Sequence, residues 1–312
     1  MKIALPFLLI FSAIVMCSCK VKSENDNANN IKNDESVSET INAKILENPI
    51  LTDYKLYISQ LDSTNIKTVT IGAKRYKEIF IRQSYSTCDS AFDIFNKYYE
   101  RMEDLLNQAY ADDSTNFDAF AIEQANPLPQ TLKNYRKILL NNGFDIDTEE
   151  GITYIKQDRN FIAKYFYNII SPTMKAYQIQ LNIENAEGFV RDASIVISPA
   201  KLIDRLIWYD KFIYENPEFQ YRNECNQSKK KYLSILFYGV DNTPLYSSDN
   251  PTKVSDYFEK AYQYLISKYP GARITALLKP YYDALEKNQT DISKNLVLKY
   301  TNEGIIDNQT EQ

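Results

Sequence analysis

The chain has 312 residues, which is enough for one large domain or two smaller ones with a core that needs no metal or disulfide framework. A hydrophobic fraction of 44% and a charged fraction of 25% are ordinary for a globular protein, so they exclude wholesale disorder and many membrane spans. The formal net charge is -5 without a run of basic residues, which argues against nucleic acid as a partner, because phosphate contacts need clustered Lys and Arg.

Two residue types are scarce, and both scarcities bear on catalysis. Histidine is absent, which removes the commonest general base near neutral pH and the commonest imidazole metal ligand. Glycine occurs only 7 times, and neither GxxxxGKS nor GxGxxG is present to cradle a phosphate. We therefore expect a protein that is not an enzyme, with no catalytic residues, no metal and no cofactor.

Residues 1–18 have the shape of a signal peptide. Lys2 is followed by an apolar run from Ile3 to Met16 and then by small or sulfur-bearing residues. The run is about 14 residues long, shorter than the roughly 20 that cross hydrocarbon as a helix. Cleavage is therefore favoured over a permanent membrane anchor.

The segment Met16-Cys17-Ser18-Cys19 resembles the lipobox of bacterial lipoproteins. Ser18 and Cys19 match that motif, whereas Met16 and Cys17 depart from it. The resemblance implies that Cys19 becomes the mature N-terminus and carries acyl chains such as palmitate, and two or more chains anchor a protein stably. It also implies a place in the cell envelope, on the periplasmic or surface face of the outer membrane. The alternative is an ordinary secretory signal with incidental cysteines.

Residues 19–49 form the predicted tether between this anchor and the body. The stretch is rich in Asn, Asp, Ser, Glu and Lys and contains no aromatic residue. Such a composition cannot bury enough apolar surface to offset the entropy of ordering. We predict a flexible tether, followed by a helical body over 50–287.

The first part of the body, residues 54–110, has helical periodicity. Asp89 is the predicted N-cap of a helix whose apolar residues recur every three or four positions. Residues 66–81 fit a helix better than a strand pair. Prolines at 127 and 129 indicate a subdomain joint near 126–150, with a loop or small hairpin near 144–157.

The remaining body is also predicted to be helical. Asp158 and Ser171 begin two helices, and Ser198 followed by Pro199 begins a third, because Ser caps a first turn and Pro needs no donor there. A fourth begins at Asn250 and pairs with 274–285 in a hairpin that looks like a tetratricopeptide-type pair. Residues 288–312 are predicted to be a polar C-terminal tail. The fold class expected is all-α, built of helical hairpins.

Two further segments, residues 150–161 and 239–246, resemble parts of uncharacterised helical lipoproteins of the Bacteroidetes type. The similarity covers roughly the C-terminal half of the chain. It implies the same compartment and a mainly helical body, and it implies no known activity.

An acidic cluster and two cysteines are the candidate sites of the body. Asp145, Asp147, Glu149, Glu150 and Asp158 supply oxygen ligands of the kind calcium prefers, but their spacing does not fit an EF-hand, so a solvated loop is favoured. Outside the cytoplasm, Cys88 and Cys225 either form a disulfide or remain two inert buried thiols.

The aromatic content leaves two interpretations open. Tyr occurs 25 times, Phe 15 times and Trp once, at Trp208. Aromatic stripes at helical spacing indicate a core, although Tyr also serves recognition surfaces such as sugar sites. We expect a lipoprotein that binds a protein partner, since helical hairpins with exposed acidic faces commonly present a groove for a peptide. The alternatives are a cell-surface glycan-binding protein and, second, a carboxylate-based hydrolase.

Overall fold

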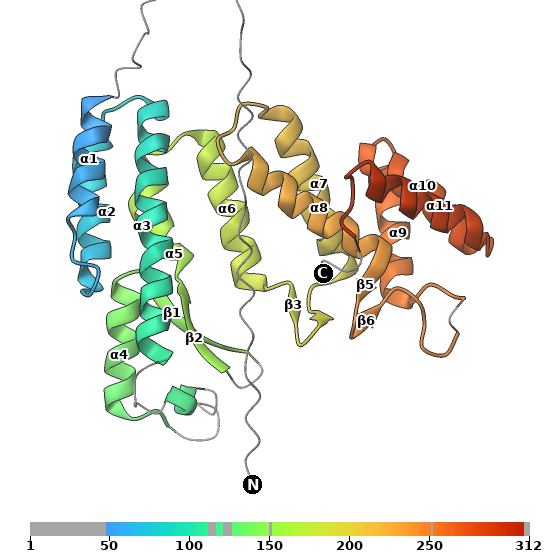
Figure 1. Cartoon of the computed structure of the whole chain (residues 1–312), viewed down its shortest axis with the longest axis horizontal. Helices are drawn as coiled ribbons and strands as arrows, with labels where there is room; N and C mark the ends of the chain where they lie inside the picture. The colour runs from blue at the N-terminus through green and yellow to red at the C-terminus, as the bar shows by residue number, and fades with distance from the viewer. Residues whose placement is uncertain (1–47, 112–116, 121–126, 150–151, 251, 309–312) are drawn as a thin grey trace, which may run out of the picture. The chain divides into compact units, whose positions relative to one another are not determined.

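The computed structural model describes residues 48–111, 117–120, 127–149, 152–250 and 252–308. The predicted signal peptide, Cys19 and nearly all of the predicted tether lie outside these ranges. Residues 47–312 form one compact unit. Its described part contains eleven α-helices, one short 3-10 helix and three two-stranded antiparallel hairpins (Figure 1). The prediction of a mainly helical fold is confirmed.

The first three helices are α1 (Pro49–Ser59), α2 (Lys67–Phe80) and α3 (Tyr85–Ala111), and α1 and α2 both pack against α3. The predicted stripe of α3 is buried, as are the inward residues of α2. Asp89 is not an N-cap, because α3 begins four residues earlier. There the Ser84 hydroxyl accepts from the Thr87 amide, while the Asp89 carboxylate accepts from the Ser171 amide at 2.8 Å.

The predicted hairpin forms between β1 (Phe144–Glu149) and β2 (Ile152–Gln157), after helix α4 (Gln130–Asn141). Period-2 alternation places Ile146 and Ile155 opposite each other on the buried face. The strand β2 packs against α3, and β1 packs against α4. The segment 126–150 is thus built into the compact unit that contains the helices on either side of it.

Four helices follow the hairpin: α5 (Arg159–Phe166), α6 (Pro172–Glu187), α7 (Pro199–Glu215) and α8 (Arg222–Tyr238). The predicted cap at Ser198 is confirmed, because its side chain accepts a hydrogen bond from a first-turn amide, and the side chains of Asp158 and Ser171 cap α5 and α6 in the same way. The hairpin of β3 (Val190–Arg191) and β4 (Ser194–Ile195) connects α6 to α7.

The C-terminal part contains α9 (Asp256–Lys268), α10 (Arg273–Glu286) and α11 (Thr290–Asn302), after the hairpin of β5 (Gly239–Val240) and β6 (Thr243–Pro244). The predicted pair is present as α9 packed on α10. Its predicted start at Asn250 is wrong. Val254 bridges Tyr246, and the Ser255 amide donates to the Leu245 carbonyl, so α9 begins only at Asp256.

The predicted end of the body at residue 287 is also wrong. Helix α11 packs against α10, and Tyr300 and Ile306 are buried. Few side chains of α11 are buried, so the composition of this part of the sequence is polar on average although Tyr300 and Ile306 belong to the core.

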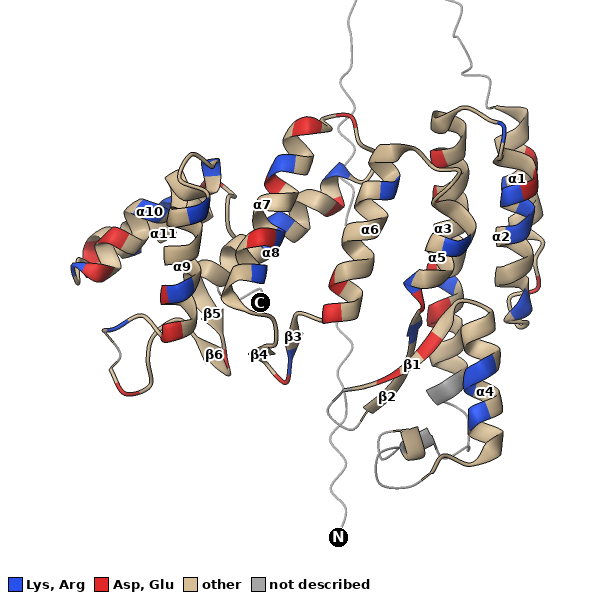
Figure 2. Cartoon of the chain, turned by 180° about the vertical axis from the view of Figure 1, so that it is seen from behind, with Lys and Arg blue, Asp and Glu red and all other residues tan. Residues whose placement is uncertain are grey.

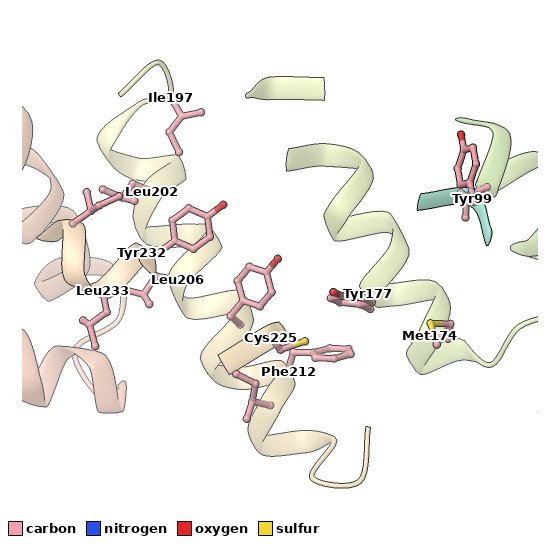
Figure 3. Packing of buried hydrophobic residues seen from close by; sticks show 14 of the residues in the cluster. Tyr99, Met174, Tyr177, Ile197, Leu202, Leu206, Phe212, Cys225, Tyr232 and Leu233 are labelled. Atoms are coloured by element: carbon pink, nitrogen blue, oxygen red, sulfur yellow. The ribbon is translucent and has the colours of Figure 1, made fainter. Parts of the chain in front are cut away.

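Tyrosine supplies much of this core, and several of the buried hydroxyls donate to backbone carbonyls. Tyr54 donates to Gly72 at 3.1 Å, and Tyr281 donates to Phe237 at 3.2 Å. Tyr262 donates to Leu236. Figure 3 shows buried side chains gathered where α7 and α8 meet, among them Leu202, Leu206, Tyr232 and Leu233.

None of the described helices combines the length and the apolar character that a membrane-crossing helix requires.

Candidate functional site

A groove of about 630 Å³ lies between α1 and α3, and we call it the α1–α3 groove. Its floor is apolar: Leu51 and Ile58 come from α1, Leu61 from the following loop, and Ile94 and Tyr98 from α3. The α1 helix begins at the groove, because Asn48, which caps α1 through the Ile50 amide at 3.1 Å, is one of the lining residues. An apolar hollow of this size can hold apolar side chains of another molecule.

The rim of the α1–α3 groove is basic. The lining contains three cations, Lys55 of α1 and Lys97 and Arg101 of α3, but only one carboxylate, Asp93. Asp93 is already occupied, since it accepts from Lys97 at 2.8 Å and from the Tyr221 hydroxyl at 2.9 Å. Within the described residues, Lys55 and Arg101 have no ion-pair partner. Figure 2 shows the basic segments on α1 and α3.

A second hollow of about 400 Å³, the Arg205 pocket, lies between the β1–β2 hairpin, the β3–β4 hairpin and helices α6, α7 and α8. Arg205 is only 4% exposed. Its Nη2 donates to Glu187 at 2.9 Å and its Nη1 to the Tyr232 hydroxyl at 3.3 Å. Its buried Nε has no acceptor in the part of the chain that the structure describes. Such an unpaired buried donor costs about 1–3 kcal/mol.

The two acids that line the Arg205 pocket are each held by other groups. Asp147 accepts from Lys156 at 2.5 Å and lies 3.8 Å from Arg191, and these neighbours hold the pKa of its carboxyl below the usual value despite partial burial. Glu184 accepts from the Tyr232 hydroxyl at 2.9 Å and from Gln180 at 2.7 Å. Neither carboxylate is left to accept from Arg205.

The predicted acidic cluster is spread along the hairpin. Asp145 pairs with Arg136 at 2.9 Å, Asp147 pairs with Lys156, and Asp158 caps α5. Glu150 and the side chain of Glu149 lie outside the described residues. Among the described residues no group of three or more acids, cysteines or histidines could hold a metal ion.

The two cysteines of the body are free and buried, so of the two alternatives left open by the sequence the structure has the buried thiols and not the disulfide. Cys88 lies on α3 and its thiol donates to the Phe80 carbonyl at 3.3 Å. Cys225 lies on α8, where burial raises the pKa of its thiol to about 12. A thiol with so high a pKa is a poor nucleophile.

Trp208 and the tyrosines bear on the glycan interpretation. The Trp208 ring stacks on Phe212 with centroids 4.6 Å apart, is partly buried, and lines a shallow hollow of about 370 Å³. Tyr214 is 70% exposed, whereas the largest fully buried side chains include five tyrosines. Most of the aromatic stripes therefore belong to the core, as the helical spacing predicted.

Arg205 and Lys231, which line the Arg205 pocket, are not among the residues that the sequence singled out. A signal was present for Arg205, because it lies three residues after Leu202 and directly before Leu206, on the buried stripe of α7. A charged residue at such a position must find partners inside the protein. Lys231 carries no comparable signal, because its position beside Phe189 depends on the packing of α8 against the β3–β4 hairpin region.

No family model matches the chain, and neither the curated proteins nor the solved structures include one that is similar to it.

Proposed function

We propose that the protein is a lipid-anchored lipoprotein of the cell envelope that acts by binding a protein partner in the α1–α3 groove, without catalysing a reaction. The observation that supports this function is the combination of an apolar floor with a basic rim in a chain of net negative charge. The occupant inferred from that combination is an amphipathic helical segment that carries acidic residues beside its apolar stripe.

The two parts of the groove have different roles in this binding. Apolar side chains at positions i, i+3, i+4 and i+7 of the partner helix lie on the floor, where removal of their surface from water provides affinity. Carboxylates along the flanks of that helix meet Lys55 and Arg101, which are free to pair. Charge pairs at an exposed rim chiefly set the choice of partner and the rate of association.

Reversing the charge of the rim is expected to weaken binding. For the Lys55→Glu/Arg101→Glu double variant, we expect the dissociation constant of an acidic amphipathic peptide to rise about tenfold or more, because each exposed ion pair contributes roughly 0.2–1 kcal/mol and reversal replaces attraction by repulsion. The measurement is fluorescence polarisation of a labelled peptide with Leu at i, i+3, i+4 and i+7 and Glu on both flanks.

The matched control is Lys74→Glu, an exposed reversal on α2 outside the groove, which should leave the affinity unchanged. The same peptide with Lys in place of Glu should bind the double variant better than the wild type. Equal affinity of the Glu peptide for all three proteins would refute the groove as the site. Tighter binding after deletion of residues 20–46 would show that the chain's own acidic segment occupies the groove.

The membrane anchor is a separate part of the proposed function. We expect Cys19→Ser to abolish acylation and to release the protein from membranes, because the acyl chains are the proposed attachment and each buried methylene contributes about 0.8 kcal/mol. Intact mass of detergent-extracted protein, wild type beside variant, measures this. The wild type should show cleavage before Cys19 plus the mass of the acyl chains.

Cys17→Ser is the control, since Cys17 is not the proposed attachment site and its variant should still be acylated and retained. A wild-type mass without lipid would refute the anchor and leave the groove to be tested on a free protein. Protease treatment of whole cells then distinguishes the two faces of the membrane, because only a surface-exposed body is degraded.

A further inference from the structure

A hollow of about 760 Å³ is lined by residues of α7, α8, α10 and the turn after α11, and we call it the α8–α10 pocket. Part of its wall is aliphatic. Ile213, Leu233 and Ile274 belong to this wall and are at most 7% exposed, and Leu277 and Ile305 are half-buried beside them. The volume lies within the range of roughly 300–1,000 Å³ that is usual for small-molecule sites.

Four basic side chains line the α8–α10 pocket, but only one acidic side chain does. Arg222, Lys229 and Lys230 come from α8, and Arg273 is the first residue of α10. All four keep part of the side chain exposed, so a molecule in the pocket can reach them. The acidic residue is Asp210, which lies 3.3 Å from Arg273 and 3.7 Å from Lys229, so two cations share it.

The excess of positive charge remains when a carboxylate outside the lining is counted as well. Lys230 pairs at 2.6 Å with Asp307, which follows α11 and is not itself a lining residue. Arg222 is exposed and has no ion-pair partner in the part of the chain that the structure describes. The four cations therefore share two carboxylates, and two positive charges remain uncompensated.

The backbone adds to the positive potential of the pocket. Arg222 begins α8 and Arg273 begins α10, and neither helix has a side-chain cap at its N-terminus. A helix N-terminus bears about half a positive charge, so basic residues are unfavourable in the first turn. The first turn of α10 contains no acid, and Glu224 in that of α8 does not line the pocket. A bound anion would offset this repulsion.

We propose that the α8–α10 pocket binds a small aliphatic molecule that carries a phosphate monoester. The phosphate has roughly 1.5 to 2 negative charges at pH 7, which matches the excess of two cations. The guanidinium groups of Arg222 and Arg273 present pairs of donors that suit phosphate oxygens. A phosphate monoester gathers its charge at one end and leaves the other end apolar, as a lining of both basic and aliphatic side chains favours. The site shares no residue with the α1–α3 groove, so the proposal does not depend on partner binding there.

The test is isothermal titration calorimetry of the full chain in detergent with hexyl phosphate, hexyl sulfate and inorganic phosphate. We expect hexyl phosphate to bind. Hexyl sulfate has the same chain with a single charge, and inorganic phosphate has the charge without the chain, so each should bind about tenfold more weakly or not at all. Arg222→Gln and Arg273→Gln should each weaken the binding of hexyl phosphate about threefold to fivefold.

Arg75→Gln is the matched control and should leave binding unchanged. Like Arg273, Arg75 is an exposed arginine that pairs with a carboxylate and lies over a tyrosine ring, but it belongs to α2, outside the pocket. All three arginines are exposed, and far-UV circular dichroism checks that their variants are folded.

No binding of hexyl phosphate, or wild-type affinity of both pocket variants, would overturn the site. Hexyl sulfate binding equal to hexyl phosphate would overturn the doubly charged group, and inorganic phosphate binding equal to hexyl phosphate would overturn the aliphatic chain. Binding to phosphatidic acid vesicles without binding of hexyl phosphate would overturn the small ligand in favour of a lipid surface.

Discussion

Above pH 10 the protein is expected to unfold in one steep transition that is complete near pH 11 to 11.5. Burial raises the pKa of eight core tyrosines far above the ordinary value of 10, with smaller contributions from neighbouring charges. All eight are at most 7% exposed: Tyr54, Tyr76, Tyr99, Tyr177, Tyr209, Tyr232, Tyr262 and Tyr281.

The sign of the effect follows from which state binds the proton. The pKa of each of these tyrosines is higher in the folded state than in the unfolded state. The stability that they contribute is therefore fully present below pH 10 and is lost progressively as the pH rises from 10 toward the pKa of the folded state. At pH 11 each unfolded phenol gains about 1.4 kcal/mol from ionisation that the folded state cannot match. Eight such groups amount to about 11 kcal/mol, which equals the total stability of many proteins.

Absorbance at 295 nm, which reports tyrosinate, and far-UV circular dichroism along a pH titration check this expectation. The core tyrosines should ionise together with the loss of the helical signal. Helicity that persists to pH 12 while all tyrosines ionise would contradict the buried core.

Replacement of Gly239 by alanine is expected to destabilise the folded state by about 2–6 kcal/mol. Gly239 ends α8 and begins β5 at φ +72° and ψ -161°, a conformation that costs a side chain about 1–3 kcal/mol. A Cβ there would lie 2.6 Å from the Leu245 amide nitrogen and 2.9 Å from the Thr243 carbonyl oxygen, and these backbone atoms can move only if the β5–β6 hairpin opens. Crowding of this kind adds about 1–3 kcal/mol.

Thermal unfolding measures this loss, and about 3 kcal/mol lowers the melting temperature by roughly 6–12 °C in a domain of this size. Two alanine variants serve as controls. Gly271→Ala meets no atom within 4 Å and has no positive φ, so its melting temperature should be unchanged. In Gly304→Ala the new Cβ meets no atom, but φ is +68°, so this variant isolates the cost of the backbone conformation. Its melting temperature should lie between those of the other two variants. Equal melting temperatures of all three would show that the hairpin is not built as described.

The sequence predicts helices correctly where one helix face is buried over many turns. The stripes of α2, α3 and α7 recur every three or four residues and could be identified without the structure. The hairpins β3–β4 and β5–β6 could not, because a strand of two residues has no measurable period. Asn250 shows a further limit. Its side chain accepts from the Thr252 amide as an N-cap would, yet no helix begins there, because Val254 bridges Tyr246 and the Ser255 amide donates to the Leu245 carbonyl.

The candidate sites depend on residues that are far apart in the chain. The α1–α3 groove brings Lys55 to Arg101, and the Arg205 pocket brings the β1–β2 hairpin to α7 and α8. Periodicity predicts which face of a helix is buried, but it does not predict which helices become neighbours. The burial of Arg205 could therefore be predicted from the apolar residues around it on α7. The presence of other basic side chains in the same pocket could not be predicted, because they come from other elements.

Two hydroxyls of the core make hydrogen bonds that phenylalanine could not make in the same places. The carbonyls of Leu236 and Phe237 belong to the last turn of α8, where no later amide of the helix is available to them, and Tyr262 and Tyr281 donate to these two oxygens. Phenylalanine would fill the same volume and leave both oxygens unpaired. Relatives that diverge from this chain should therefore exchange Leu for Met or Ile more freely than Tyr for Phe, so a substitution that standard similarity scales rank as mild is severe in this core.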